Sequence, residues 1–263
     1  MGANMDIFLI GHSHLQAPLT ASRIQGSIAK ADQNIRYLFT PIDGKSKWQS
    51  PLVHPDGVSI NQALGNALSV AGLFDESRTR ILVSILAGNV HNATGLIQQK
   101  QLYDVIVPSR PDLHVDRRAR TIPIEQFLYH FRKHYEPFYK FFKRLADTAR
   151  PDRVYWVEPP PPIGDSDHIA RNMDQWFKAN YSISDLIPAP AILRYKLWLL
   201  NRMVLEEMAK EGGWTLITSP ASAIDDDGFL TRQAWAGDAT HGSAWYGEEL
   251  LKKIKTTIDE DLA

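Results

Sequence analysis

The chain has 263 residues, no cysteine and a formal net charge of -1 from 29 basic and 30 acidic side chains. This near balance of charge leaves no global field that would attract nucleic acid or an anionic membrane surface, and the lack of cysteine excludes disulfides, thiolate catalysis and zinc–thiolate sites. No apolar run approaches the roughly 20 residues that cross a bilayer, and residues 1–10 lack the basic and apolar stretches of a secretory signal. We therefore expect a soluble, cytoplasmic protein with no nucleic-acid partner and no membrane span.

The predicted elements alternate between strands and helices along the chain. A short apolar run at residues 6–10 ends at Gly11, which is typical of a strand buried on both faces of a parallel sheet. Runs of similar length and composition follow at residues 35–39, 80–86, 153–157 and 214–218. Helical patterns occupy residues 15–29, 59–73, 124–149, 192–210 and 243–259. This alternation predicts one three-layer α/β/α domain over residues 1–263, with a five-stranded parallel sheet.

Two stretches depart from the simple alternation. Residues 90–122 carry several prolines and a basic run at 117–120, and residues 158–190 begin with the prolines 159–162. We predict that both are insertions over the strand ends, the first extending with its following helix to about residue 150. Aromatic residues between 127 and 142 fit either packing or a substrate-facing lid, and their helical spacing favours packing.

Polar residues follow the first strand at the point where a helix begins. The block is Gly11-His12-Ser13-His14. A serine at a strand-to-helix turn projects its hydroxyl above the sheet edge, and the helix N-terminal amides point at any oxyanion formed there. Ser13 is therefore a candidate nucleophile, although serine is also a common cap at this position.

A second polar block, Asp238-Ala239-Thr240-His241, precedes the last predicted helix. This spacing lets the Asp238 carboxylate accept a proton from one imidazole nitrogen of His241, which leaves the other nitrogen free to deprotonate a serine hydroxyl. Taken alone, the block also fits a carboxylate at a helix entry beside an exposed histidine. Its place in the fold must therefore decide between the two interpretations.

A third polar block follows the strand predicted at residues 80–86. It reads Ala87-Gly88-Asn89-Val90-His91-Asn92. An asparagine amide can donate a hydrogen bond to the negative oxygen of a tetrahedral intermediate, which is typically worth ~100–1000-fold in rate. Asn89 is the candidate donor. Alternatively, Asn89 only forms the turn after the strand, because asparagine stabilises turns by bonding to its own backbone.

These blocks, in this order and at these strand ends, resemble the SGNH or GDSL-like hydrolases. Gly11-His12-Ser13 is similar to the nucleophile block Gly-Asp-Ser of that family, and Asp238 with His241 matches its Asp-x-x-His block. The resemblance implies a flavodoxin-like SGNH hydrolase fold with Ser13 as nucleophile, His241 as general base and Asp238 as the residue that orients it. Prolines after the fourth strand are a common feature of the family, and the prolines at 159–162 are similar to it.

The resemblance also implies an oxyanion hole. Its donors would be the amide of Ser13, the amide of Gly57 and the side chain of Asn89, with Gly65 as the alternative to Gly57. The third block resembles the Gly-x-Asn-Asp block of the family. A shifted alignment with that block would make Asn92 the donor, and we favour Asn89.

Two positions depart from the family pattern. His12 stands where the family usually has aspartate, and Ala87 stands where a glycine is expected. The extra histidines His12, His14 and His91 are, with Asn92, candidate substrate contacts. Alternatively, the histidines are polar loop residues beside a solvated cleft.

The resemblance implies a serine esterase or acylhydrolase that cleaves a short-acyl ester, such as an acetyl ester, of a small molecule or carbohydrate through an acyl-enzyme. Such an enzyme needs no metal and no organic cofactor, and it could also transfer the acyl group to an acceptor other than water. The histidine-rich blocks suggest a metal-dependent phosphoesterase as a second interpretation, but their order in the chain argues against it. A non-catalytic member of the same fold that binds a glycan or small molecule is the third.

Overall fold

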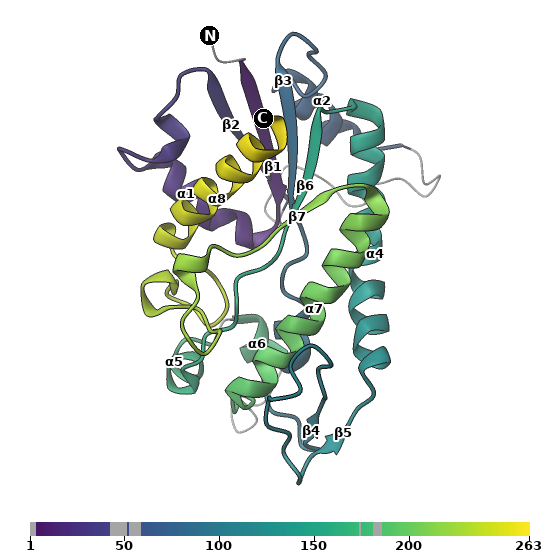
Figure 1. Ribbon diagram of the computed structural model, residues 1–263, viewed down its shortest axis with the longest axis vertical. Coiled ribbons are helices and arrows are strands. Elements are labelled where there is room, and N and C mark those ends of the chain that lie inside the picture. The colour runs from purple at the N-terminus through teal and green to yellow at the C-terminus, as the bar shows by residue number, and fades with distance from the viewer. Residues whose placement is uncertain (1–3, 43–51, 53–58, 174, 181–185) are drawn as a thin grey trace.

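The structure, a computed structural model, describes residues 4–42, 52, 59–173, 175–180 and 186–263. Parallel strands form its main sheet in the order β2-β1-β3-β6-β7 (Figure 1). Their bounds are Met5–Gly11 for β1, Ile35–Pro41 for β2, Thr79–Ile85 for β3, Arg153–Val157 for β6 and Thr215–Ile217 for β7. The five predicted strands are therefore confirmed, and their order is the doubly wound, flavodoxin-like one.

Successive side chains of the central strands point to opposite faces of this sheet, as the two-residue period of a strand requires. Ile7 and Leu9 of β1 pack with the helices α1 (Gln16–Arg23) and α8 (Ala244–Leu262), which lie side by side in Figure 1. Phe8 and Ile10 pack on the other face with α2 (Gln62–Val70) and α4 (Ile124–Ala149). The helix α7 (Ala191–Gly212) packs against α4 on that face, above Trp156 of β6. These layers confirm the predicted α/β/α arrangement.

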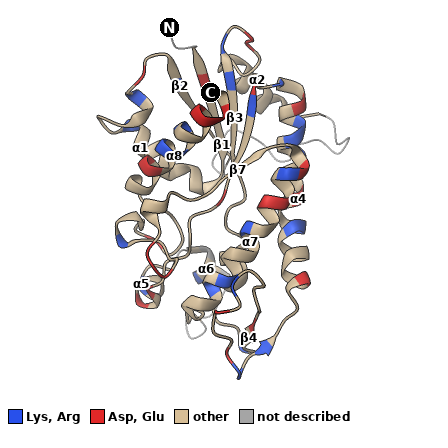
Figure 2. Ribbon diagram, in the orientation of Figure 1, with Lys and Arg blue, Asp and Glu red and all other residues tan. Residues whose placement is uncertain are grey.

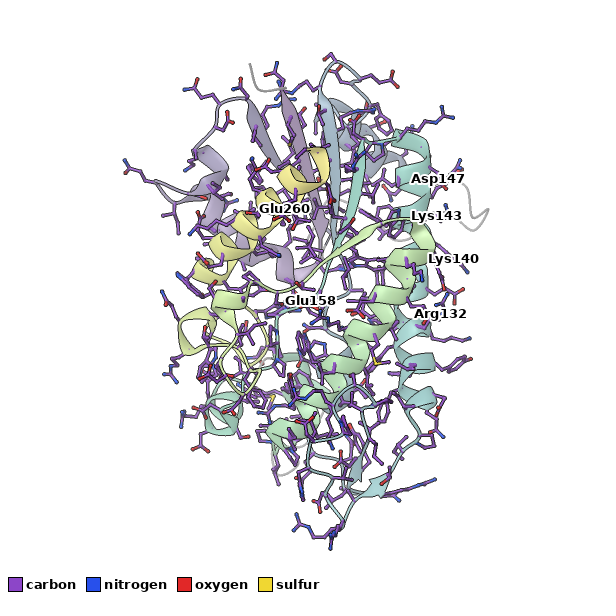
Figure 3. The ribbon with its side chains drawn as sticks, viewed as in Figure 1. Arg132, Lys140, Lys143, Asp147, Glu158 and Glu260 are labelled. Atoms are coloured by element: carbon purple, nitrogen blue, oxygen red, sulfur yellow. The ribbon has the colours of Figure 1, made fainter. Side chains whose placement is uncertain are left out.

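The helix α4 has the bounds that the sequence pattern predicts. Its inner side carries the buried rings of Phe131, Phe141 and Phe142. Its outer side carries the pair Lys143–Asp147 at 3.1 Å, and Figure 3 shows both side chains turned away from the sheet. The aromatic residues of α4 therefore serve mainly to pack the helix onto the sheet, as the helical spacing indicates.

The first predicted helix is shorter in the structure than its apolar pattern suggests. α1 ends at Arg23, and Ile24 is extended with ψ of 142°. Gly26 then has a φ of 85°, a left-handed conformation that glycine adopts without steric cost. A separate turn follows at Ile28–Lys30. The chain therefore leaves the helix six residues before the predicted end at residue 29.

Residues 90–122 and the second predicted insertion lie beyond the carboxyl ends of the sheet strands (Figure 1), whereas α4, which the first prediction included, packs on a face of the sheet. The first contains α3 (Val90–Gly95) and a small parallel sheet of β4 (Tyr103–Asp104) and β5 (Arg120–Thr121), and the second contains α5 (Ser166–Arg171) and α6 (Gln175–Asn180). Two buried cations of α7 hold them in place. Lys196 pairs with Asp104 at 2.8 Å, and Arg194 donates to the carbonyls of Ile163 and Gly164.

Candidate active site

The structure brings Ser13, His241 and Asp238 into one chain of hydrogen bonds. Ser13 lies two residues beyond the end of β1, and the turn with Asp238 and His241 precedes α8. Nε2 of His241 lies 2.8 Å from Oγ of Ser13, and Nδ1 of His241 lies 2.9 Å from Oδ2 of Asp238. In this arrangement one imidazole nitrogen faces a hydroxyl and the other faces a carboxylate, as proton transfer from a serine requires.

The Asp238 carboxylate is fixed by its own turn. Its Oδ1 accepts the backbone N–H groups of Thr240 at 2.9 Å and His241 at 2.8 Å. Burial raises the pKa of Asp238, but the hydrogen bond and charge of His241, with the two backbone amides, outweigh it and hold the pKa well below its usual range. The carboxylate is therefore ionised at neutral pH and can stabilise a positively charged His241.

The second insertion supports this turn from outside. Nε2 of His168, on α5, lies 3.0 Å from the backbone oxygen of Asp238. The ring of His168 also packs on Trp235, with 4.7 Å between the centroids, and Nε1 of Trp235 donates to the oxygen of Leu230 at 2.7 Å. The loop that carries the carboxylate is thus held by side chains far from it in the sequence.

The third polar block follows the carboxyl end of β3, and Asn89 occupies the N-cap position of α3. Oδ1 of Asn89 accepts a hydrogen bond from Nδ2 of Asn92 at 2.9 Å and lies 3.1 Å from Nε2 of His14. Both contacts engage the carboxamide oxygen, and Nδ2 of Asn89 donates to no group in the described part of the chain. Asn92 and His14 therefore orient Asn89 so that its amide hydrogens remain available.

His14 is suited to this role because it stays neutral. The side chain is buried, and burial together with the charge of the neighbouring His241 lowers the pKa of His14 well below its usual range. The two rings lie 4.8 Å apart between centroids. The close approach of the third block to His14 also explains Gly88, because a Cβ there would come within 2.6 Å of Cδ2 of His14.

The two departures from the family pattern contact one another. Nδ1 of His12 accepts the backbone N–H of Ala87 at 2.9 Å. Ala87 has a φ of 59°, in the left-handed region where glycine is favoured. The His12 ring packs edge-on against Phe138 of α4, with 4.9 Å between centroids. His12 therefore helps to hold the strained backbone of Ala87 just before Asn89.

The other predicted site residues, His91, Gly57 and Gly65, differ in what the structure shows of them. His91 is buried, neither of its ring nitrogens has a hydrogen-bond partner in the described part of the chain, and burial lowers its pKa to about 3. Gly57 lies outside the described residues. The amide of Gly65 donates to the oxygen of Asn61 at 2.9 Å within α2, so this amide is not free for an oxyanion. Contact of His12, His14, His91 and Asn92 with substrate stays a prediction.

Sequence reasoning missed a buried polar group beside the strand ends. Glu158 directly follows β6 near the middle of the molecule (Figure 3), and its Oε1 accepts the backbone N–H of Ser219 at 2.6 Å. Burial raises the pKa of Glu158 to about 7. Oγ of Ser219 lies 3.3 Å from the hydroxyl of Tyr246 on α8. The available signal was an acidic residue at a strand end, but its partners lie far away in the sequence.

Within the described ranges, no three His, Asp or Glu side chains gather in a group that could hold a metal ion. No described helix combines the length and the apolar character needed to cross a membrane.

Comparison with known proteins supports the fold. No family model matches the sequence, and no curated protein matches it. A protein from Streptococcus pneumonia, provisionally named a platelet activating factor, is similar in structure with a TM-score of 0.50 and 12% identity over 98% of this chain and 84% of that chain. A provisionally named acylhydrolase from Bacteroides fragilis has a TM-score of 0.49 and 13% identity over 98% and 88%. The first of these likenesses shows a shared fold, which agrees with the fold that the sequence blocks predict.

Proposed function

We propose that the protein is a serine esterase or acylhydrolase that cleaves a short-acyl ester of a small molecule or carbohydrate. The observation that carries this proposal is the hydrogen-bond chain from Ser13 through His241 to Asp238, at 2.8 and 2.9 Å. It joins residues 228 positions apart in the sequence at one edge of the sheet. A hydroxyl, an imidazole and an ionised carboxylate in this order make a serine nucleophile available near neutral pH.

In the first half of the reaction, Oγ of Ser13 attacks the ester carbonyl while Nε2 of His241 removes the hydroxyl proton. The ionised Asp238 stabilises the imidazolium that results. When the tetrahedral intermediate collapses, the bond to the alcohol breaks, and His241 gives the proton to the leaving alkoxide. Water then attacks the acyl-enzyme with His241 again as base, which releases the carboxylic acid and restores the serine.

The negative oxygen of each intermediate needs preorganised donors. We assign two to described residues, the backbone N–H of Ser13 and Nδ2 of Asn89. Neither donates a hydrogen bond elsewhere in the described part of the chain, and the Asn89 side chain is oriented by Asn92 and His14. The resemblance adds the amide of Gly57 as a third donor.

Hydrolysis of p-nitrophenyl esters of increasing acyl length tests the proposal. The Ser13→Ala variant should lose at least about 1000-fold in kcat, because no other side chain replaces the nucleophilic hydroxyl. Ser69→Ala is the matched control, since Ser69 is an exposed residue of α2 whose hydroxyl has no partner in the described residues. Turnover by Ser13→Ala at a rate near that of the control would refute the proposal, provided that circular dichroism shows both variants folded.

A further inference from the structure

A cavity of about 710 Å³ lies in the first insertion, between α3, residues 98–103, β5 and the start of α4. This volume is within the range of small-molecule binding sites. Its floor is aromatic, because the rings of Tyr103 and Phe127 lie 5.8 Å apart between centroids. The hydroxyl of Tyr103 is anchored by donation to the oxygen of Thr94 on α3, at 2.9 Å. The cavity therefore has a preformed apolar surface. Its Tyr103 ring is held by the Phe127 ring and by the hydrogen bond to Thr94.

The polar lining of this cavity is cationic and rich in amides. It includes Lys100, Arg120 and His130 with four glutamines, and no Asp or Glu among the described residues lines it. Lys100 and Arg120 are exposed, and neither forms an ion pair or a side-chain hydrogen bond within the described part of the chain. Some other exposed cations have such partners, for example Arg118, which pairs with Asp116 at 2.9 Å. The positive charge at this cavity is thus left without an internal partner.

A neighbouring hollow adjoins the cavity, and its lining is of mixed charge, because Asp104 and Asp116 lie there beside Arg117 and Arg118. It has a volume of about 690 Å³ and shares Tyr103 and residues 98, 99 and 102 with the cavity. Arg117 lines it and also lacks a partner among the described residues. Figure 2 shows segments with Lys and Arg, in blue, near β4, at the end of the molecule opposite the N-terminus. Because the whole chain carries a formal net charge of only -1, the unpaired positive charge of the first cavity is a local feature of the insertion.

The cavity is connected to the candidate active site by α3. Asn89 caps the beginning of this helix, and Thr94 near its end lines the cavity. The six residues of α3 span about 9 Å at the usual rise per residue. A molecule that reaches from Ser13 to the cavity must therefore be longer than a simple acyl ester, and its distal part must suit an aromatic floor with a cationic, amide-rich wall.

We propose that this cavity is a binding subsite for an anionic saccharide that carries carboxylate or phosphate groups. The rings of Tyr103 and Phe127 would pack on the apolar face of a sugar, and the glutamine amides would bond its hydroxyls. Lys100 and Arg120 would pair with the anionic groups. That an ester on this saccharide is the substrate at Ser13 rests on the proposed function, whereas binding in the cavity does not.

Calorimetric titration of the Ser13→Ala protein tests the binding. The probes are an oligogalacturonate, a phosphorylated dextran oligomer and the unmodified dextran oligomer as the neutral control. At least one anionic oligomer should bind about tenfold more tightly than the neutral one, and added salt should weaken it. The anionic oligomer that binds more tightly identifies the charged group.

Charge-removing variants then locate the site. Lys100→Gln combined with Arg120→Gln should weaken binding of the anionic oligomer about tenfold, through loss of two exposed charge pairs. Lys210→Gln is the matched control, because Lys210 is an exposed lysine in the last turn of α7, at the other end of the sheet. With Ser13 restored, the double variant should raise KM for an acetylated oligogalacturonate about tenfold relative to Lys210→Gln.

The outcomes separate the two proposals. Equal binding of neutral and anionic oligomers, no binding of any oligomer, or a double variant that binds as the control does would overturn the subsite. Binding with the expected charge dependence in a protein that hydrolyses no ester would instead overturn the proposed function and leave the subsite standing.

Discussion

Separate replacement of Asn89 and Asn92 distinguishes the residue that stabilises an oxyanion from the residue that positions it. The Asn92 amide nitrogen is engaged, because it donates to Oδ1 of Asn89 at 2.9 Å, and its side chain is 5% exposed. The Asn89 amide nitrogen has no such engagement in the described part of the chain. We therefore expect Asn89→Ala to lower kcat for p-nitrophenyl acetate far more than Asn92→Ala.

The magnitudes follow from the contacts of each side chain. A lost oxyanion donor costs ~100–1000-fold in kcat, or ~2.7–4 kcal/mol. Asn92→Ala removes one of the two contacts that hold the Asn89 oxygen, while His14 remains at 3.1 Å. One neutral hydrogen bond is worth about 1 kcal/mol, which corresponds to a loss of about fivefold. In the Asn89→Ala background, Asn92→Ala should have no further effect, because no donor remains to be positioned.

Steady-state kinetics of the two single variants and the double variant measure these differences, and thermal unfolding checks that each protein is folded. An Asn92→Ala loss as large as that of Asn89→Ala would refute the assignment of the donor. Losses that multiply in the double variant would refute the positioning role, since independent residues contribute independently.

Three further variants test other parts of the account. Asp238→Asn should lower kcat by about 1000- to 10,000-fold, because the carboxylate that orients His241 is lost, and a loss under about tenfold in aryl-ester turnover would contradict this. Glu158 has a folded-state pKa of about 7 against a usual 4.5, so its contribution to the free energy of unfolding is fully present below pH 4.5 and falls by about 3 kcal/mol as the pH rises through 7. Glu158→Gln should remove this decline in urea titrations at pH 4.5 and 8, and parallel declines in variant and wild type would speak against it. Ala87→Gly should raise the free energy of unfolding by about 1 kcal/mol, because the left-handed φ of 59° strains alanine, and an unchanged or lower value would exclude such strain.

The main sheet could be predicted from the sequence because its strands are buried on both faces. Residues 7–10 of β1 have no exposed surface, so an uninterrupted apolar run was a sufficient signal. The long helix α4 was equally clear, since its apolar side repeats with the helical period. The strands β4 and β5 have two residues each, and so short a pairing leaves no pattern to detect. Their position depends on the buried contact of Asp104 with Lys196.

The candidate site was predictable where short blocks stand at strand or helix ends. Ser13, Asp238 and His241 each belong to such a block, and the structure brings them together. The orienting contact of His14 could not be predicted, because its partner Asn89 is 75 positions away in the chain. The same separation joins His12 to Ala87. Such contacts follow from the strand order, which places β1 beside β3, rather than from any local pattern.

Covalent labelling with a fluorophosphonate, followed by peptide mass spectrometry, tests the central claim most directly, because such reagents report an activated serine and also identify it. The account predicts an adduct on Ser13 that forms much more slowly in His241→Ala and is lost in Ser13→Ala. An adduct on a different residue, or an unlabelled protein that still hydrolyses aryl esters, would contradict it.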